Sequence, residues 1–249
     1  MARKTSSHTS GSATTSKQTP DKKTEPSSPI IVFPKISKKF RKNLKVETLL
    51  EDQVVLVHDV FNQQEVKDFI RFFETLQMTH SPPAKRGEAQ RTNDRFSTIS
   101  PEFAAHLYES TGLIDIVHDW PARPSNLKNS GSSMKARGLL ENIRVYSYTE
   151  GQYFASHYDE SQRSQLNPML HTEWTLLIYL SAPTTPLIGG ETIFHLPGNR
   201  NSNGKKTLSV NPVSGSAMLH RHGKDCLLHE GSVVKSGVKW VLRSDILFG

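Results

Sequence analysis

The sequence predicts a mainly β protein with flanking helices, in which a sandwich or barrel of strands forms the core. From Leu139 onward, short apolar or alternating runs recur with turn residues between them, which is typical of β sandwiches and barrels. Before this region, residues 62–77 have apolar side chains at helical spacing, and Asn62 is a suitable N-cap. The apolar positions of this helix are Val66, Phe69, Ile70, Phe73 and Leu76.

The remaining elements follow from the same patterns. Residues 54–57 form a short apolar strand, and residues 101–111 a second helix that ends at Gly112. Two prolines and a glycine exclude a continuous helix from residues 81–97, so this stretch and residues 119–137 are predicted loops. Strands are expected at residues 143–148, 154–159, 173–182, 190–194, 213–220, 225–229 and 239–248.

Residues 1–45 are predicted to be a disordered, basic N-terminal tail. They hold 11 Lys and Arg against 2 Asp and Glu, a charge of +9, whereas residues 46–249 hold 20 against 22, a charge of −2. Residues 1–29 contain too little apolar surface to offset the entropy of ordering. The cluster Lys38–Lys42 is either a nuclear import signal or nucleic-acid contact, or a solvated linker. Nucleic-acid binding is therefore a hypothesis for the tail and is not expected of the core.

The cysteine content and the absence of long apolar runs bear on the compartment. Cys226 is the only cysteine, which excludes an internal disulfide framework and fits a reducing compartment, the cytoplasm or the nucleus. No run of about 18 apolar residues is present, so a membrane partner is not expected. The N-terminus also lacks the apolar segment of a secretory signal. The sequence makes no prediction of oligomeric state.

The chemistry of the chain is predicted to centre on His157, Asp159 and His229. Residues two apart in a strand share a face, so His157 and Asp159 can present a nitrogen and an oxygen side by side. His229, from a distant strand, can complete one face of an octahedron. Two imidazoles and one carboxylate with open positions opposite suit non-haem Fe(II) and O2 chemistry. The nearby His220 and His222 are interpreted as structural or supporting residues.

The sequence resembles the Fe(II)/2-oxoglutarate-dependent dioxygenases, specifically the prolyl-4-hydroxylase-like branch. The resemblance rests on Tyr-x-x-Gly-x-x-Phe-x-x-His-x-Asp at 148–159, Gly-Gly-Glu-Thr at 189–192 and His-x-Gly-x-x-Val-x-x-Gly-x-Lys-Trp at 229–240. It implies a double-stranded β-helix (a jelly roll, cupin-like) and the cofactors Fe(II), 2-oxoglutarate and O2, and it allows ascorbate. In that case residues 46–249 form the dioxygenase domain, with helical support at 46–138 and the β-helix core at 139–249.

The resemblance also implies roles for individual residues. His157, Asp159 and His229 match the metal ligands, and Lys239 matches the cation that meets the distal carboxylate of 2-oxoglutarate. Arg243 shares the strand face of Lys239 and is a rival anchor, although pairing with Asp245 is the favoured interpretation. Two further residues match tyrosines near the cosubstrate. These are Tyr148 and Tyr179.

The expected reaction is decarboxylation of 2-oxoglutarate to succinate and CO2, coupled to hydroxylation of an unactivated C–H. A peptidyl proline is the first substrate hypothesis, and a small metabolite is the second. Substrate contacts are expected in the loops at 81–97 and 121–134; the candidates are Arg91, Asn93, Asp94 and Arg95. The rival hypotheses are a non-catalytic binding module and an adaptor that acts through the basic tail.

Overall fold

The computed structural model describes residues 31–117, 120, 134–197 and 206–249. The chain divides into two units at Val32, and every element described below belongs to the second unit, Phe33–Gly249. None of the helices in these residues is long and apolar enough to cross a membrane.

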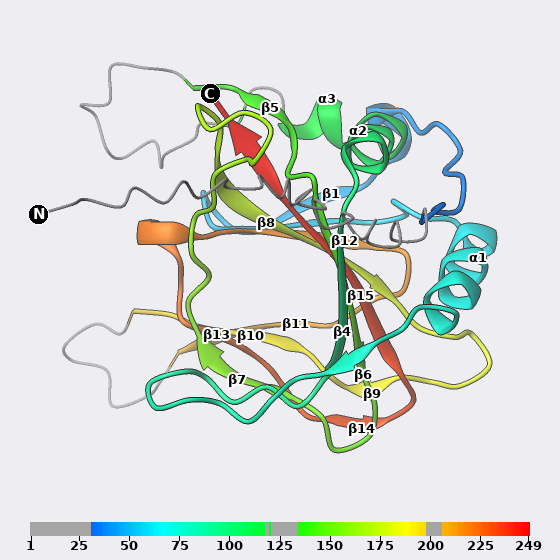
Figure 1. The fold of residues 1–249 in the computed structure, drawn as a ribbon, viewed down its shortest axis with the longest axis vertical. Helices are drawn as coiled ribbons and strands as arrows, with labels where there is room; N and C mark the ends of the chain where they lie inside the picture. Colours follow the sequence, from blue (N-terminus) through cyan, green and yellow to red (C-terminus); the bar gives the residue numbers. More distant parts are fainter. Residues whose placement is uncertain (1–30, 118–119, 121–133, 198–205) are drawn as a thin grey trace, which may run out of the picture. The chain divides into compact units, whose positions relative to one another are not determined.

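A nine-stranded antiparallel sheet forms the larger layer of the fold (Figure 1). At its centre β15 pairs with β8 on one side and β6 on the other. The strands along the sheet are β1 (Val46–Leu50), β2 (Val54–Val57), β12 (Ala217–Arg221), β8 (His171–Leu180), β15 (Lys239–Phe248), β6 (Asn142–Tyr148), β4 (Asp94–Ile99) and β3 (Thr79–His80), with β5 (Ala136–Leu139) also pairing with β15.

A smaller sheet of four antiparallel strands is the second layer. Its order is β11 (Thr207–Val210), β10 (Thr192–His195), β13 (His229–Gly231) and β7 (Phe154–His157). Beside it, β9 (Ile188–Gly189) pairs with β14 (Val234–Ser236). The prediction of a mainly β fold with flanking helices is therefore confirmed.

The alternation of side chains along β15 divides the core into two parts. Trp240 and Leu242 belong to a cluster that also contains the buried residues of the helices. Val241 belongs to a second cluster, together with residues of the smaller sheet such as Phe194. Because successive side chains point to opposite faces, Lys239 and Arg243 lie on the same face as Val241, between the two sheets, as predicted.

Three helices pack on the other face of the large sheet (Figure 1). They are α1 (Gln63–Glu74), α2 (Pro101–Ser110) and α3 (Leu113–Val117). Asn62 caps α1 as predicted, and Glu65 completes a capping box with it. The predicted end of the second helix at Gly112 agrees with its positive φ of 73°.

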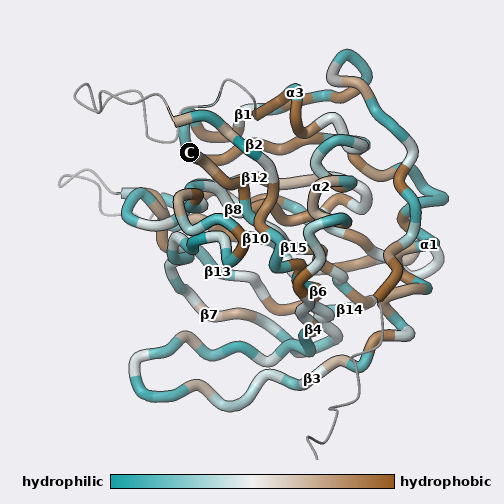
Figure 2. The backbone as a smooth tube through the Cα atoms, turned by 45° about the horizontal axis from the view of Figure 1, so that its top comes forward, coloured by the Kyte–Doolittle hydropathy of each residue, from teal (hydrophilic) through white to brown (hydrophobic). Residues whose placement is uncertain are grey.

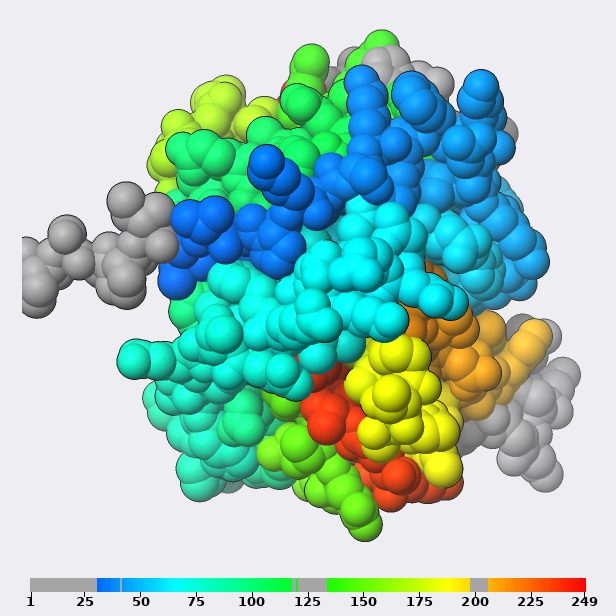
Figure 3. All heavy atoms as spheres, turned by 90° about the vertical axis from the view of Figure 1, so that its right-hand side faces the viewer, coloured from blue at the N-terminus to red at the C-terminus, as the bar shows by residue number. Residues whose placement is uncertain are grey.

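The segment Phe33–Lys45, which the sequence places in the tail, packs on α1 and α2. Phe33 stacks on Phe103 with ring centroids 3.8 Å apart, and the backbone N–H of Lys39 donates to Ser110 O. The Lys39 ammonium also pairs with Glu65 at 2.7 Å. A 3-10 turn, η1 (Arg41–Asn43), follows. Figure 3 shows this segment, in dark blue, beside the cyan of α1. Residues 1–30 lie outside the described residues.

Several predicted boundaries differ from the structure. The strand predicted at 154–159 ends at His157, and the strand predicted at 213–220 begins at Ala217. The predicted strand at residues 225–229 is instead a 3-10 turn, η2 (Gly223–Asp225), followed by β13, which begins at His229. Gly223 has a φ of 69° and donates its N–H to Asp159 O, so the chain turns here between the two sheets. The predicted loop at 81–97 ends earlier, because β4 begins at Asp94 and alternates in burial.

Candidate active site

His157 and His229 are directly opposite each other on neighbouring strands of the smaller sheet. They are register partners in the pairing of β7 with β13. Asp159 follows two residues after His157, beyond the end of β7. Its carboxylate lies 3.7 Å from Nε2 of His157 and 3.9 Å from Nε2 of His229. The ligand atoms of these three residues all lie within 4.8 Å of one another, so the structure brings them together as one group that can hold a metal ion.

Both imidazoles present Nε2 as a free acceptor. Nδ1 of His157 lies 2.8 Å from Ala155 O, and Nδ1 of His229 lies 2.9 Å from Leu227 O. Since a carbonyl oxygen can only accept, each Nδ1 carries the proton and each Nε2 is unprotonated. Burial, together with neighbouring His229, lowers the pKa of His157 to about 4. Burial likewise lowers the pKa of His229. Both rings are therefore neutral near pH 7, the form that binds metals.

Asp159 is held as an anion by Arg243. The two Nη atoms of Arg243 lie 3.1 and 3.0 Å from the two carboxylate oxygens, and the Thr175 hydroxyl donates at 2.9 Å. Burial alone would raise the pKa of Asp159, but the Arg243 guanidinium outweighs it and holds the pKa well below its usual range. The carboxylate is thus charged and fixed in orientation.

The predicted pairing of Arg243 with Asp245 is present as an ion pair, in which Nε lies 3.4 Å from the Asp245 carboxylate without a hydrogen bond. Asp245 also pairs with Arg144 of β6. The closer, bidentate partner of Arg243 is Asp159, which the sequence did not predict. The guanidinium is engaged with Asp159, because β15 places Arg243 level with Asp159 inside the barrel, so Arg243 is not a free cation.

Lys239 lies at the start of β15 and is not hydrogen-bonded to the Arg243–Asp159 pair. Its neighbours include a backbone carbonyl and two tyrosine rings. It is buried, its ammonium donates to Gly190 O at 2.6 Å, and it lies 5.5 Å from the ring centroid of Tyr148 and 5.2 Å from that of Tyr179. Burial lowers the pKa of Lys239 to about 8, opposed by Glu191. Burial also raises the pKa of both tyrosines, so their hydroxyls are neutral donors.

A small cavity joins Lys239 to the metal-binding group. Its volume is about 50 Å³, which is room for a few water molecules or one end of a dicarboxylate. Its wall includes Lys239, Tyr148 and Thr192 together with His157, Asp159 and His229. Tyr179 does not line the cavity, but its hydroxyl lies 2.8 Å from that of Thr192, which does.

A larger groove of about 1300 Å³ meets this cavity. The two share part of their wall, at Tyr146, Phe154, His157, Asp159 and Arg243. The other side of the groove is the segment between β3 and β4, which runs beside β7 and is mostly hydrophilic (Figure 2). The metal-binding group therefore lies where a buried cavity meets an open groove.

The predicted substrate residues divide into two pairs. Arg91 lines the groove with its guanidinium 4.6 Å from the ring centroid of Phe154, and Arg95 also lines it. Asn93 is buried and accepts from the Ser81 hydroxyl, and Asp94 pairs with His80 at 2.8 Å. Neither belongs to the groove wall, so their contacts are structural. Of the second predicted loop, residues 121–133 lie outside the described residues.

Sequence reasoning assigned no role at this site to Cys226 and gave His220 only a general one. Nε2 of His220 lies 3.7 Å from the Asp159 carboxylate, and the Cys226 sulfur accepts the backbone N–H of Asp159 at 3.3 Å. Burial raises the pKa of the Cys226 thiol to about 11. His222 is structural, with its ring nitrogens on the hydroxyls of Thr172 and Thr175. In the sequence, the only indication of these neighbours is that His220 and Cys226 lie within nine residues of His229.

The chain is similar to known oxygenases in sequence. Residues 143–244 match the 2OG-Fe(II) oxygenase superfamily. Prolyl 4-hydroxylase 13 of Arabidopsis thaliana is 32% identical over 118 residues, which cover 42% of this chain and 42% of the relative. The chain thus matches less than half the length of that curated relative. The matched residues contain the metal-binding group, the cavity wall on β15 and most of the β strands.

Solved structures share the fold. A prolyl hydroxylase of Trichoplax adhaerens, in complex with a hypoxia inducible factor peptide fragment, has a TM-score of 0.54 at 14% identity and covers 80% of this chain and 85% of that chain. The carbocyclase SnoK from nogalamycin biosynthesis has a TM-score of 0.52 at 14% identity and covers 85% and 87%. The fold is the double-stranded β-helix that the resemblance implied, and residues 143–244 are similar in sequence to the 2OG-Fe(II) oxygenase superfamily.

Proposed function

We propose, from its similarity to the 2OG-Fe(II) oxygenases over residues 143–244, that the protein is an Fe(II)- and 2-oxoglutarate-dependent dioxygenase that hydroxylates an unactivated C–H. The observation that carries the proposal is the pair of free imidazole Nε2 atoms beside the Asp159 carboxylate, at the mouth of a cavity whose wall carries Lys239. This donor set fits Fe(II). Bound iron, with 2-oxoglutarate and O2, would supply the oxidation, releasing succinate and CO2.

The residues of this chain would divide the work. His157, Asp159 and His229 would hold the iron, while Arg243 and Thr175 keep the Asp159 carboxylate charged and oriented. The Lys239 ammonium would leave Gly190 O and meet the distal carboxylate of 2-oxoglutarate, with Tyr148 in the cavity wall beside it. Ascorbate is compatible with this chemistry.

A peptidyl proline is the substrate that we propose. The groove has a volume of about 1300 Å³ and reaches the metal-binding group, and a polypeptide segment is the substrate that we expect it to hold. The Arabidopsis relative and the Trichoplax structure carry prolyl hydroxylase names. A small metabolite is the alternative substrate. It is retained because SnoK, a carbocyclase from nogalamycin biosynthesis, has the same fold. Arg91 and Arg95 are the substrate contacts that the groove wall supports.

We place the protein in the cytoplasm or the nucleus, because its one cysteine suits a reducing compartment. Any contact with nucleic acid is assigned to the basic residues before 46, since residues 46–249 carry a charge of −2. Deletion of residues 1–45 separates the two hypotheses: an adaptor that acts through the tail should lose its binding, whereas an enzyme assayed below its melting temperature should keep its turnover.

The test is anaerobic addition of Fe(II) and then 2-oxoglutarate to the purified protein. We expect a visible metal-to-ligand charge-transfer band in the wild type and none in His157→Ala, which lacks one ligand. Proline-containing peptides then provide the turnover assay, read as succinate formed per hydroxyproline. A folded, iron-loaded wild type without the band would refute the dioxygenase assignment and favour a binding module.

A further inference from the structure

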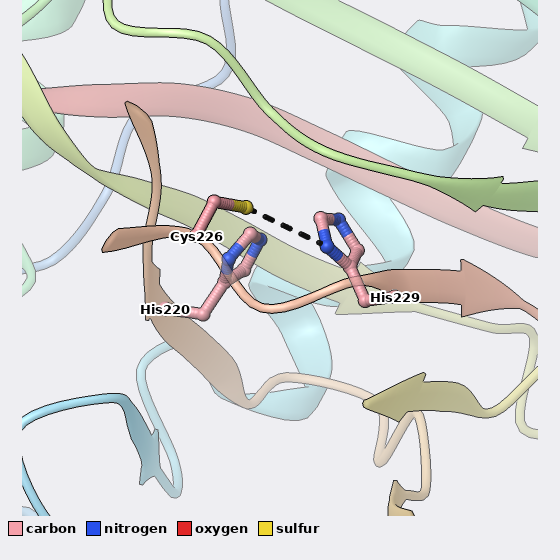
Figure 4. Close-up of side chains that lie close together, drawn as sticks. All are labelled: His220, Cys226 and His229. Atoms are coloured by element: carbon pink, nitrogen blue, oxygen red, sulfur yellow. Dashed lines mark hydrogen bonds between the residues drawn. The ribbon is translucent and has the colours of Figure 1, made fainter. Parts of the chain in front are cut away.

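A second group of metal-ligand side chains overlaps the first. His220 on β12, Cys226 just after η2 and His229 on β13 bring two nitrogens and one sulfur within 4.8 Å of one another. In Figure 4 the sulfur and the two rings point toward one another. The Cys226 sulfur lies 3.8 Å from Nδ1 of His229.

An independent observation points to a ligand at this group. His220 is only 1% exposed, and its Nε2 has no hydrogen-bond partner. Its Nδ1 lies 3.0 Å from Arg221 O and therefore carries the proton, which leaves a lone pair on Nε2. The nearest acidic oxygen, on Asp159, is 3.7 Å away and beyond hydrogen-bond distance. Buried polar atoms without partners are rare in folded proteins, and a bound cation would satisfy this one.

We propose that His220, Cys226 and His229 form a binding site for a thiophilic divalent cation, specifically Zn²⁺. Two imidazoles and one thiolate favour zinc over harder cations and leave a fourth tetrahedral position for water. With zinc bonds of about 2.3 Å to sulfur and about 2.0–2.1 Å to nitrogen, ligand atoms lie roughly 3.5 Å apart. The observed separation of 3.8 Å between Cys226 and His229 is close to this value.

Zinc and iron would compete because the two groups share His229. Without zinc, the Nδ1 proton of His229 is bonded to Leu227 O, and this leaves Nε2 free for iron. A cation between Cys226 and Nδ1 replaces that proton, so the arrangement that keeps Nε2 free is lost. Zinc would therefore inhibit the oxygenase by displacing iron. This consequence, unlike the site itself, depends on the proposed function.

The test uses Co²⁺ as a spectroscopic probe for zinc under anaerobic conditions. Cys226 is the only cysteine, so a near-ultraviolet thiolate-to-cobalt charge-transfer band can arise from no other residue. We expect this band in the wild type, its loss in Cys226→Ser and its persistence in His157→Ala, which removes a ligand of the iron group only. Serine is the matched control because its oxygen can still accept the N–H of Asp159. Added Zn²⁺ should abolish the band.

His220→Phe tests the third ligand. The new ring would have an aromatic neighbour, because the ring centroid of Phe194 lies 5.4 Å from that of His220. We expect cobalt affinity to fall by at least about tenfold. Loss of a residue that only hydrogen-bonds to a metal ligand already costs about this much, and His220 is proposed to be a ligand itself. An unchanged band in folded His220→Phe, or cobalt uptake by the wild type without the band, would overturn the zinc site. If His220→Phe does not fold, the comparison of Cys226→Ser with His157→Ala decides.

The two proposals fail separately. An iron–2-oxoglutarate band without a thiolate–cobalt band would refute the zinc site and support the oxygenase. The opposite pair of results would refute the oxygenase and support the zinc site.

Discussion

At the scale of single residues, two cations on one face of β15 differ in availability. Arg243 already pairs with both oxygens of Asp159, whereas Gly190 O is the only hydrogen-bond acceptor of the Lys239 ammonium among the described residues. Both are buried. A cosubstrate carboxylate can therefore recruit Lys239 without breaking an ion pair, but it could recruit Arg243 only by releasing the charge of Asp159.

The first prediction separates these roles. Lys239→Ala should raise the KM for 2-oxoglutarate by about 10- to 100-fold, because a hydrogen bond to a charged group contributes about 1.5–3 kcal/mol. Arg243→Lys keeps the charge but loses the bidentate contact, so it should raise the Fe(II) requirement instead. Titrations of both variants with each ligand provide the measurement. If Arg243→Lys had the larger effect on 2-oxoglutarate, the anchor would be Arg243.

The second prediction concerns pH. Because burial lowers the pKa of Lys239 to about 8, the ammonium is present below that pH and loses its proton as the pH rises through it. The KM for 2-oxoglutarate should be nearly constant below pH 7 and rise by about tenfold for each pH unit well above 8. Lys239→Arg is the control, since an arginine stays protonated throughout. A wild-type KM that stays constant to pH 10 would contradict a lysine anchor.

The sequence could predict which residues of the site meet because their spacing is local or follows a strand. His157 and Asp159 are two apart, and Lys239 and Arg243 share a face by period two. The pairing of Arg243 with Asp159 and the place of Cys226 could not be predicted in this way, although the pairing of Arg243 with Asp245 could. Both depend on how two sheets close over each other, which brings residues 84 and 67 positions apart into contact.

At the scale of elements, the pairing of β9 with β14 supports the Lys239 end of the cavity. Gly189 has a φ of 78°, and a Cβ added to it would lie 2.3 Å from Val233 O. Gly190 has a φ of 73°, and its carbonyl accepts from Lys239. Glycine is therefore required at 189 for two reasons, a left-handed backbone and a close approach of β14. The sequence shows the Gly189–Gly190 pair but does not indicate which strand approaches it.

The third prediction follows from this geometry. Gly189→Ala should lower the free energy of unfolding by at least about 2 kcal/mol, from left-handed strain of about 1–2 kcal/mol and overpacking of about 1–3 kcal/mol. Gly87→Ala is the matched control, because its φ is 90° but nothing lies within 4 Å of an added Cβ. Denaturant unfolding compares the two. If both variants lost the same free energy of unfolding, the close approach of an added Cβ to Val233 O would have no effect on stability.

At the scale of the whole molecule, alternation predicted the two-sheet core because it is repeated in every long strand. β8 buries Trp174 and Ile178 against the helices and turns Tyr179 inward. The edge of the folded unit was harder to predict. Phe33, Ile36 and Leu44 are scattered in a basic, polar stretch, and only the tertiary structure shows that they belong to the same core cluster as the buried residues of the helices.

The last prediction compares two deletions that remove parts of this region. Removal of residues 1–29 should leave the Tm nearly unchanged, because their composition provides little apolar surface to bury. Removal of residues 1–45 should lower the Tm by more than about 5 °C. It exposes the surface covered by Phe33, Ile36 and Leu44, and it leaves the buried Glu65 without Lys39.

Since a loss of 1 kcal/mol shifts the Tm of a domain of this size by about 2–4 °C, calorimetry resolves the difference. Equal melting temperatures for both deletions would mean that Phe33–Lys45 contributes no stability, and a large drop for the shorter deletion would mean that residues 1–29 are themselves folded onto the domain.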